Sequence, residues 1–272
     1  MALSEKIELL GKGLYKNIPD ELTLASIPTI SELDYVSGED FDETMINKIL
    51  PKAVEEDVNF RELLEIDYQW ICRCLRILNF GPYHTTNAVY CGSCGERSYG
   101  EYLVDLRTIE CKVLPEGFVN DVTITKDEFL DYDKSVSFKL PTIGQMLAAG
   151  KDKAFKLPDG RQNRELSRIC YMITAIDGQK SLTPMEVKFK IEDKMSAADY
   201  FMLKERITEL SDYGLRAGGS TICPKCGNPS AAFVALVDDR FFRPSARALQ
   251  QWKHDKGQRK GKDIPRNTAD NV

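Results

Sequence analysis

The stretch TICPKCGNPS, residues 221–230, holds two thiols in a Cys-x-x-Cys-Gly turn, Cys223 and Cys226. The stretch VYCGSCGE repeats this pattern with Cys91 and Cys94. A structural Zn²⁺ ion is tetrahedral and takes four nitrogen or sulfur donors at about 2.0–2.3 Å, so either pair alone is half a site. In such a turn both sulfurs can face one ion while backbone N–H groups near the glycine donate to them. The two pairs together predict one structural four-cysteine zinc site.

The distance between the pairs leaves other arrangements open. Roughly 130 residues separate them, against about 15–20 in a compact zinc finger. Either a zinc ribbon carries a large insertion, or the two pairs bind metal separately across a dimer. Redox chemistry or a disulfide at each pair is a further alternative. A thioredoxin-like motif, however, needs a single Cys-x-x-Cys at the start of a helix, whereas both pairs lie among β-prone residues.

Composition is that of an ordinary globular protein in a reducing compartment. The chain has 272 residues, 42% hydrophobic and 29% charged, which suggests one or two domains. It contains no apolar run long enough for a membrane span, and its first residues do not resemble a signal peptide, so we expect it to remain where it is made. Four further cysteines lie in apolar contexts and are expected to be buried free thiols: Cys72, Cys74, Cys111 and Cys170.

Charge is unevenly distributed along the chain. Residues 1–69 hold sixteen acids against six lysines and arginines, whereas residues 253–266 are basic. Such runs are most often solvated faces. The sharper interpretation is attraction between neighbouring subunits of an assembly.

The predicted fold class is α+β, with a helical N-terminal region and zinc-ribbon β-hairpins that carry a large, mainly helical insertion between the two Cys-x-x-Cys turns. The predicted regions are an extended N-terminal arm (1–27), a helical region (28–82), the first zinc-ribbon half with a strand pair (83–141), the helical insertion (142–214), the second zinc-ribbon half (215–240), and a C-terminal helix with a basic tail (241–272).

Individual elements follow from periodicity and caps. The arm, with a strand near 21–27, has little to bury alone and is expected to dock on a neighbouring element or chain. Helices are predicted at 29–37, 41–50, 59–80, 142–150, 163–176, after the Thr183-Pro184 cap, and at 197–210, where Ser196 and Asp199 form the cap; strands are predicted at 121–129 and 134–141. A C-terminal helix near 241–254 is expected to expose Phe241, Leu249 and Trp252 to a partner, and the last dozen residues are expected to be disordered.

Catalytic motifs are not evident. His84 and His254 are the only histidines, and His84 is expected on a strand surface. No phosphate-binding loop, metalloprotease helix or nucleophile elbow occurs. Four thiolates would fill a tetrahedral shell and leave no position for a catalytic water. The sequence therefore favours a non-enzymatic protein; an unrecognised site around Asp131, Asp133 and Glu192 is the weaker alternative.

Four segments follow one another in a characteristic order: GKGLYKNIPDELTLASIPT, EIDYQWICRCLRILNFG, VYCGSCGERSYGEYLVDLRTIECKVLPEGF and SVSFKLPTIGQM. This order resembles the baseplate hub protein family of contractile-tailed bacteriophages of the T-even kind. The resemblance spans about residues 8–146 and includes a helix motif with Asp67, Arg73 and Arg76, and the turn from Cys91 to Gly95. Residues 147–212 and the basic tail have no counterpart in the family pattern, so the position in the tail is left open.

The resemblance implies a virion structural or assembly role. The chain would be a baseplate subunit that caps the tail tube or joins the hub to the wedges. It would be made in the host cytoplasm, located in the virion tail baseplate, and bound to other tail proteins in a multimer. One alternative is a tail assembly chaperone absent from the finished virion. Another is a nucleic-acid-binding zinc ribbon, against which stand a pI near 5.3 and the lack of a basic and aromatic stripe around Arg97, Arg107 and Lys112.

Overall fold

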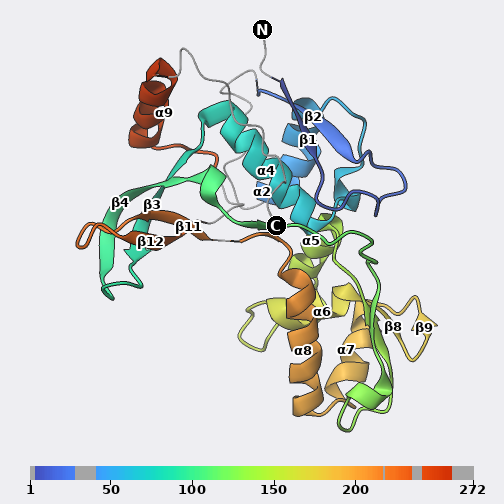
Figure 1. The fold of residues 1–272 in the computed structure, drawn as a ribbon. Helices are drawn as coiled ribbons and strands as arrows, with labels where there is room; N and C mark the ends of the chain where they lie inside the picture. The colour runs from blue at the N-terminus through green and yellow to red at the C-terminus, as the bar shows by residue number, and fades with distance from the viewer. Residues whose placement is uncertain (1–3, 28–40, 217, 235–240, 259–272) are drawn as a thin grey trace.

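The computed structural model describes residues 4–27, 41–216, 218–234 and 241–258. The structure contains both helices and strands, and two hydrophobic cores form: one around the long helix α4 (Glu65–Phe80), the other mainly within the segment between the two cysteine turns. Figure 1 shows the cysteine-turn hairpins and this intervening segment in separate parts of the molecule. The expected mixture of helices and strands is confirmed.

The N-terminal segment docks on a neighbouring element of its own chain and contains the expected strand near 21–27, but it forms a hairpin where an extended arm was expected. Strands β1 (Ser4–Glu8) and β2 (Glu21–Ala25) pair antiparallel. Leu22 and Leu24 are fully buried in the core around α4. The loop between the strands is anchored by Asp67 of α4, which accepts hydrogen bonds from the backbone N–H groups of Leu10 and Gly11. The apolar side chains of this hairpin are therefore covered without a neighbouring chain.

Helix α4 confirms the predicted core helix and its end, but it begins at Glu65 and not at residue 59, after a separate 3₁₀ turn at Phe60–Glu62. It follows a helical stretch made of α2 (Phe41–Thr44), a π-helical turn (Met45–Ile49) and α3 (Leu50–Ala53). The predicted end near Pro51 is thus passed by two residues. Gly81 ends α4 with a φ of 78°, a left-handed conformation that favours glycine. The helix predicted at 29–37 lies outside the described residues.

A four-stranded antiparallel sheet joins two segments that are far apart in the sequence. Its order is β11-β12-β3-β4, formed by β11 (Gly218–Ile222), β12 (Pro229–Phe233), β3 (Tyr83–Tyr90) and β4 (Arg97–Asp105). The two hairpins meet where Ala231 pairs with Tyr90 and Ala232 with Val89. Because β11 and β3 are both antiparallel to β12, they run in the same direction, and the turns that follow them lie at the same end of the sheet.

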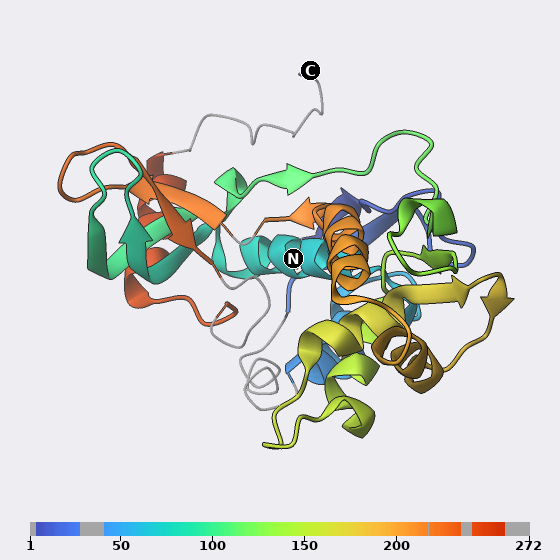
Figure 2. The ribbon, with the colours of Figure 1, turned by 90° about the horizontal axis from the view of Figure 1, so that it is seen from below.

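The segment between the hairpins is mainly helical over residues 142–214, as expected, but it also contains a sheet that was predicted only in part. The sheet has the order β6-β7-β8-β9, with β6 (Val122–Ile124), β7 (Val136–Phe138), β8 (Ile173–Ile176) and β9 (Gln179–Lys180). Its helices are α5 (Ile143–Lys151), α6 (Arg164–Met172), α7 (Pro184–Glu192) and α8 (Ala197–Ser211). The strand pair predicted at 121–141 is present and belongs to this sheet, which Figure 2 shows beside the helices.

The predicted end of one helix in this segment was wrong. The pattern predicted a helix through residue 176, but α6 ends at Met172 and Ile173 begins β8. Ile173 and Ile176 are buried in either case, so the apolar spacing did not discriminate. Residues 173–176 are extended because they pair with β7, which lies 35 or more positions earlier in the sequence. The caps by Thr183 and Ser196 are confirmed, since each side chain accepts a backbone N–H from the helix it precedes.

The C-terminal helix α9 (Ala246–Gln258) packs on the molecule, which corrects the expected exposed face. Phe241 is fully buried, and Leu249 and Trp252 are half-buried. A Cβ on Gly81 would lie 2.4 Å from the Trp252 ring, so this indole rests on the end of α4. The last dozen residues and most of the basic tail lie outside the described residues. A short bridge, β5 (Cys111–Lys112) with β10 (Gly214–Leu215), closes the two ends of the intervening segment.

Candidate metal centre

The four predicted ligands come together at the end of the hairpin sheet. The Sγ atoms of Cys91, Cys94, Cys223 and Cys226 all lie within 4.8 Å of one another. Cys91 and Cys226 are 3.6 Å apart, and Cys94 and Cys223 are 3.8 Å apart. A tetrahedron of sulfurs at about 2.3 Å from a Zn²⁺ ion has edges of about 3.8 Å. The donor set and its spacing therefore fit a tetrahedral metal ion, and no pair is a disulfide.

The two turns have the same local structure. In the first, Cys91 donates its N–H to the Glu96 carbonyl at 2.9 Å, and its own carbonyl accepts from Gly95 at 2.8 Å. In the second, Cys223 donates to Asn228 at 2.8 Å and accepts from Gly227 at 3.0 Å. Both glycines are left-handed, with φ of 70° and 72°. This conformation explains the shared glycine of the two motifs, because a Cβ would be strained there.

Thiolate character differs within the cluster. A hydrogen bond from the Ser230 hydroxyl, with the backbone N–H of Cys94, lowers the pKa of Cys91 to about 6. Backbone N–H groups of Cys226 and Lys225 lower the pKa of Cys223. These two sulfurs are buried, whereas Cys94 and Cys226 are exposed at the rim. The fold thus stabilises the charged form of the inner pair, which is the form that a metal requires.

The turns are also joined by an ion pair. Lys225 Nζ lies 2.8 Å from a Glu96 oxygen and brings a positive charge toward the thiolates. Both side chains reach solvent, so this pair contributes little to stability by itself. Behind the turns, β11 lies back across β4, where Thr221 donates to the Leu103 carbonyl at 2.9 Å. A Cβ on Gly219 would lie 2.3 Å from the Val104 side chain, so this approach requires glycine.

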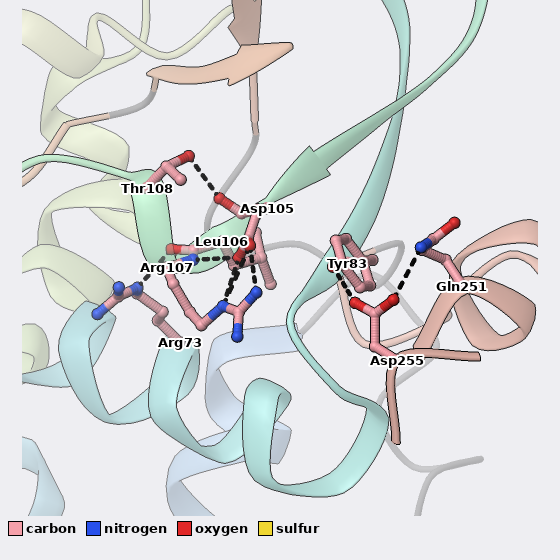
Figure 3. A network of polar contacts seen from close by, with 8 residues as sticks. All are labelled: Arg73, Tyr83, Asp105, Leu106, Arg107, Thr108, Gln251 and Asp255. Atoms are coloured by element: carbon pink, nitrogen blue, oxygen red, sulfur yellow. Dashed lines mark hydrogen bonds and ion pairs between the residues drawn. The ribbon is translucent and has the colours of Figure 1, made fainter. Parts of the chain in front are cut away.

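Polar anchors fix the sheet to α4 and α9, as Figure 3 shows. Arg73 of α4 donates from Nε to the Leu106 carbonyl at 2.9 Å, directly after β4. Tyr83, the first residue of β3, donates to Asp255 of α9, which also accepts from Gln251 at 3.0 Å. The chain that follows β4 is held by the Arg107 ion pair with Asp105 and by a 2.7 Å bond from Thr108 to the Asp105 carbonyl. These contacts hold the start of β3 and the end of β4, at the open end of the hairpin.

The other four cysteines and the acidic residues of the alternative site do not join the metal centre. Cys72, Cys74 and Cys170 are buried and Cys111 is half-buried, and burial raises the pKa of each thiol, to about 12 for Cys74 and Cys170. Asp131, Asp133 and Glu192 are all exposed. Within the described residues the four-cysteine cluster is the one group of three or more potential metal ligands. His84 lies on β3 with its ring 5.6 Å from that of Phe241.

The helix motif proved to consist of buried anchors that sequence reasoning did not assign. Asp67, Arg73 and Arg76 are between 0% and 5% exposed on α4. Arg76 donates to three carbonyls, of Phe241, Gly81 and Tyr83, at 2.6–2.9 Å. The signal was present as charged residues inside an apolar helical stripe, which rarely occur unless they are paired.

Comparisons with known proteins give no relative: no family model, no curated protein and no solved structure matches the chain. Within the described residues, no helix has the length and apolar character needed to span a bilayer.

Proposed function

We propose that this chain is a structural subunit of a contractile-tail baseplate whose two hairpins are held together by one structural Zn²⁺ ion. The observation that carries the structural part is the filled donor set: four cysteine sulfurs within 4.8 Å of one another. A catalytic zinc site keeps a position for water or substrate, and four thiolates leave none. Among metal ions we favour Zn²⁺, because a closed tetrahedral site of four thiolates is typical of structural zinc.

A bound metal ion would link the two hairpins of this fold. The strand pairing between the two hairpins is short, with two residue pairs at Tyr90 and Val89 of β3, and β11 adds a contact with β4. A Zn²⁺ ion at the turns would join the hairpins at a further point, and its binding free energy would add to the free energy of folding. The ion would also fix the intervening segment, because both ends of that segment lead into these hairpins.

The baseplate assignment rests on the resemblance, and the structure gives it one supporting argument. Its helix motif falls on Asp67, Arg73 and Arg76, which anchor the N-terminal loop, the end of β4 and the C-terminal segment, respectively. A resemblance at these positions concerns residues that hold this fold together, and not interchangeable surface residues.

Quantitative mass spectrometry of purified tails tests the assignment. We expect the chain in a fixed ratio to the other tail proteins, retained after high-salt washing. A chain that is abundant during assembly but absent from finished tails would support the chaperone alternative, and absence at both stages would refute the baseplate proposal.

Nucleic-acid binding is the weaker alternative. Of the three cations near the ribbon, Arg107 pairs with Asp105 and Lys112 with Asp212, which leaves only Arg97 without a carboxylate partner in the described part of the chain. Affinity for nucleic acid comes mainly from several phosphate contacts, each of which adds to the salt dependence. Anisotropy titrations with duplex and single-stranded DNA at low salt would detect such binding, and we expect none that depends on salt.

A further inference from the structure

The outward face of the hairpin sheet is mainly apolar, and no described part of the chain covers it. Residues paired directly across an antiparallel sheet share a face. One cross-strand row contains Ala231, Tyr90 and Arg97, and Ala88 pairs with Tyr99 in the next row. Phe233 lies two residues after Ala231 on β12 and therefore on the same face. All six are exposed; residues Tyr99, Phe233 and Tyr90 are 82%, 69% and 50% accessible. Contiguous apolar surface of this kind marks an interaction site.

The charge on this face is a single guanidinium. Arg97 lies over the Tyr90 ring, 5.7 Å from its centroid. No carboxylate pairs with Arg97 among the residues that the structure describes, and neither row contains an acid. A partner should therefore offer apolar contacts and one carboxylate. One cation is too few for a phosphate backbone, which disfavours nucleic acid as the partner.

Helix α8 presents the complementary surface. Its stripe of Ala198, Phe201, Glu205 and Thr208 has a spacing of three and four residues, so these side chains share one face. All four are exposed, opposite the buried Leu203. Phe201 is 64% accessible, and Glu205 has no cation partner in the described ranges. The stripe thus carries an aromatic ring and an unpaired carboxylate one helical turn apart.

We propose that the sheet face of one copy binds the α8 stripe of a second copy, head to tail. Arg97 would meet Glu205, and the Tyr99 and Phe233 rings would pack around Phe201. The sheet and α8 lie in different parts of one molecule in both views, so the contact joins two chains (Figures 1 and 2). A contact between unlike patches is heterologous and builds a ring or an open chain of subunits. This inference does not depend on the baseplate proposal.

Charge reversal provides the sharpest test. Sedimentation velocity is run over a concentration series on the zinc-loaded full chain, with metal content measured on every variant to verify the fold. We expect reversible self-association of the wild type, weakened about tenfold or more by Arg97→Glu or by Glu205→Arg. The double variant Arg97→Glu/Glu205→Arg restores association, because each interface regains one opposite pair.

Apolar variants test the same contact independently. Tyr99→Ser and Phe201→Ser, each on one side of the contact, should each weaken association about tenfold or more. Val119→Ser, which removes an equally exposed side chain elsewhere, should leave it unchanged. A wild type that stays monomeric at all concentrations overturns the proposal, as does association that the reversals leave intact. Binding of oligothymidylate that is lost in Tyr99→Ser, by a monomeric chain, would assign the face to nucleic acid instead.

Discussion

The Arg76 guanidinium donates a 2.6 Å hydrogen bond from Nε to the backbone carbonyl of Phe241, 165 residues further along the chain. The same group donates to the carbonyls of Gly81 and Tyr83, so one side chain joins the end of α4, the start of β3 and the C-terminal segment. Burial lowers the pKa of Arg76 to about 10, so it is still charged at neutral pH. Among the described residues this cation is balanced by carbonyl dipoles and not by a carboxylate.

Replacing Arg76 by Met should therefore be costly. Three carbonyls lose their donor in a buried site, and we expect a loss of about 2–5 kcal/mol in the free energy of unfolding, measured with urea. Arg247→Met is the matched control, because Arg247 is exposed and donates to one carbonyl, of Glu101. Equal effects of the two substitutions would show that Arg76 is not an anchor.

Gly81→Ala tests the packing of α9. The new Cβ would lie 2.4 Å from the Trp252 ring, in a backbone with a φ of 78°. Gly117→Ala is the control, since Gly117 has a φ of 73° but nothing within 4 Å, so it carries only the backbone cost of about 1–2 kcal/mol. We expect Gly81→Ala to cost more and to shift Trp252 fluorescence to the red in a Trp70→Phe background. Unchanged fluorescence would contradict the docking of α9 on this glycine.

The carboxylate of Asp199 should make the free energy of unfolding fall at acidic pH. Despite the burial of its carboxylate, hydrogen bonds from the N–H groups of Leu130, Asp131 and Tyr132 and from the Ser196 hydroxyl leave the pKa lowered. The ionised Asp199 carboxylate therefore adds to the free energy of unfolding in full above its unfolded-state pKa of about 3.9. This contribution is lost as the pH falls through the lower pKa of the folded state.

The variant Asp199→Asn isolates this effect. The difference in unfolding free energy from the wild type should be about 1–3 kcal/mol at neutral pH and should shrink below about pH 4. Asp131→Asn, at an exposed side chain of the same loop, is the control. A difference that does not change with pH would mean that the carboxylate charge is not what the loop uses.

Oxidation of the metal-free chain reports which sulfurs are neighbours. Cys91 lies 3.6 Å from Cys226, and Cys94 lies 3.8 Å from Cys223. After chelation and mild oxidation, peptide mapping should find disulfides that link the two turns. Disulfides confined to each Cys-x-x-Cys pair would indicate that the turns separate once the metal is gone.

The sequence predicted elements best where local signals agree with the tertiary structure. Matched Cys-x-x-Cys-Gly motifs, the Gly81 stop and the Thr183 cap all act within a few residues, and the structure bears out each turn or boundary. Proximity of the four sulfurs also followed, because a tetrahedral ion needs four donors and the chain offers two matched pairs.

The failures share a physical cause, which is pairing with distant residues. Ile173 begins a strand because β7 is available to pair with it, and Phe241 is buried where Arg76 binds its backbone carbonyl and its ring lies beside that of His84. The N-terminal hairpin looked unsupported because its contact with Asp67 spans 56 residues or more. The aromatic face of the hairpin sheet was invisible for the same reason, since Phe233 joins Tyr99 only through strand pairing.

We propose that the four cysteines hold one structural zinc ion within a single chain. Metal content by mass spectrometry, with the oligomeric state of the same samples, tests it on the wild type, Cys223→Ser and the control Cys111→Ser. We expect one zinc ion per chain in the wild type and in Cys111→Ser, and loss of zinc together with solubility in Cys223→Ser. Absence of zinc, half a zinc ion per chain in a dimer, or full retention in Cys223→Ser would contradict the account.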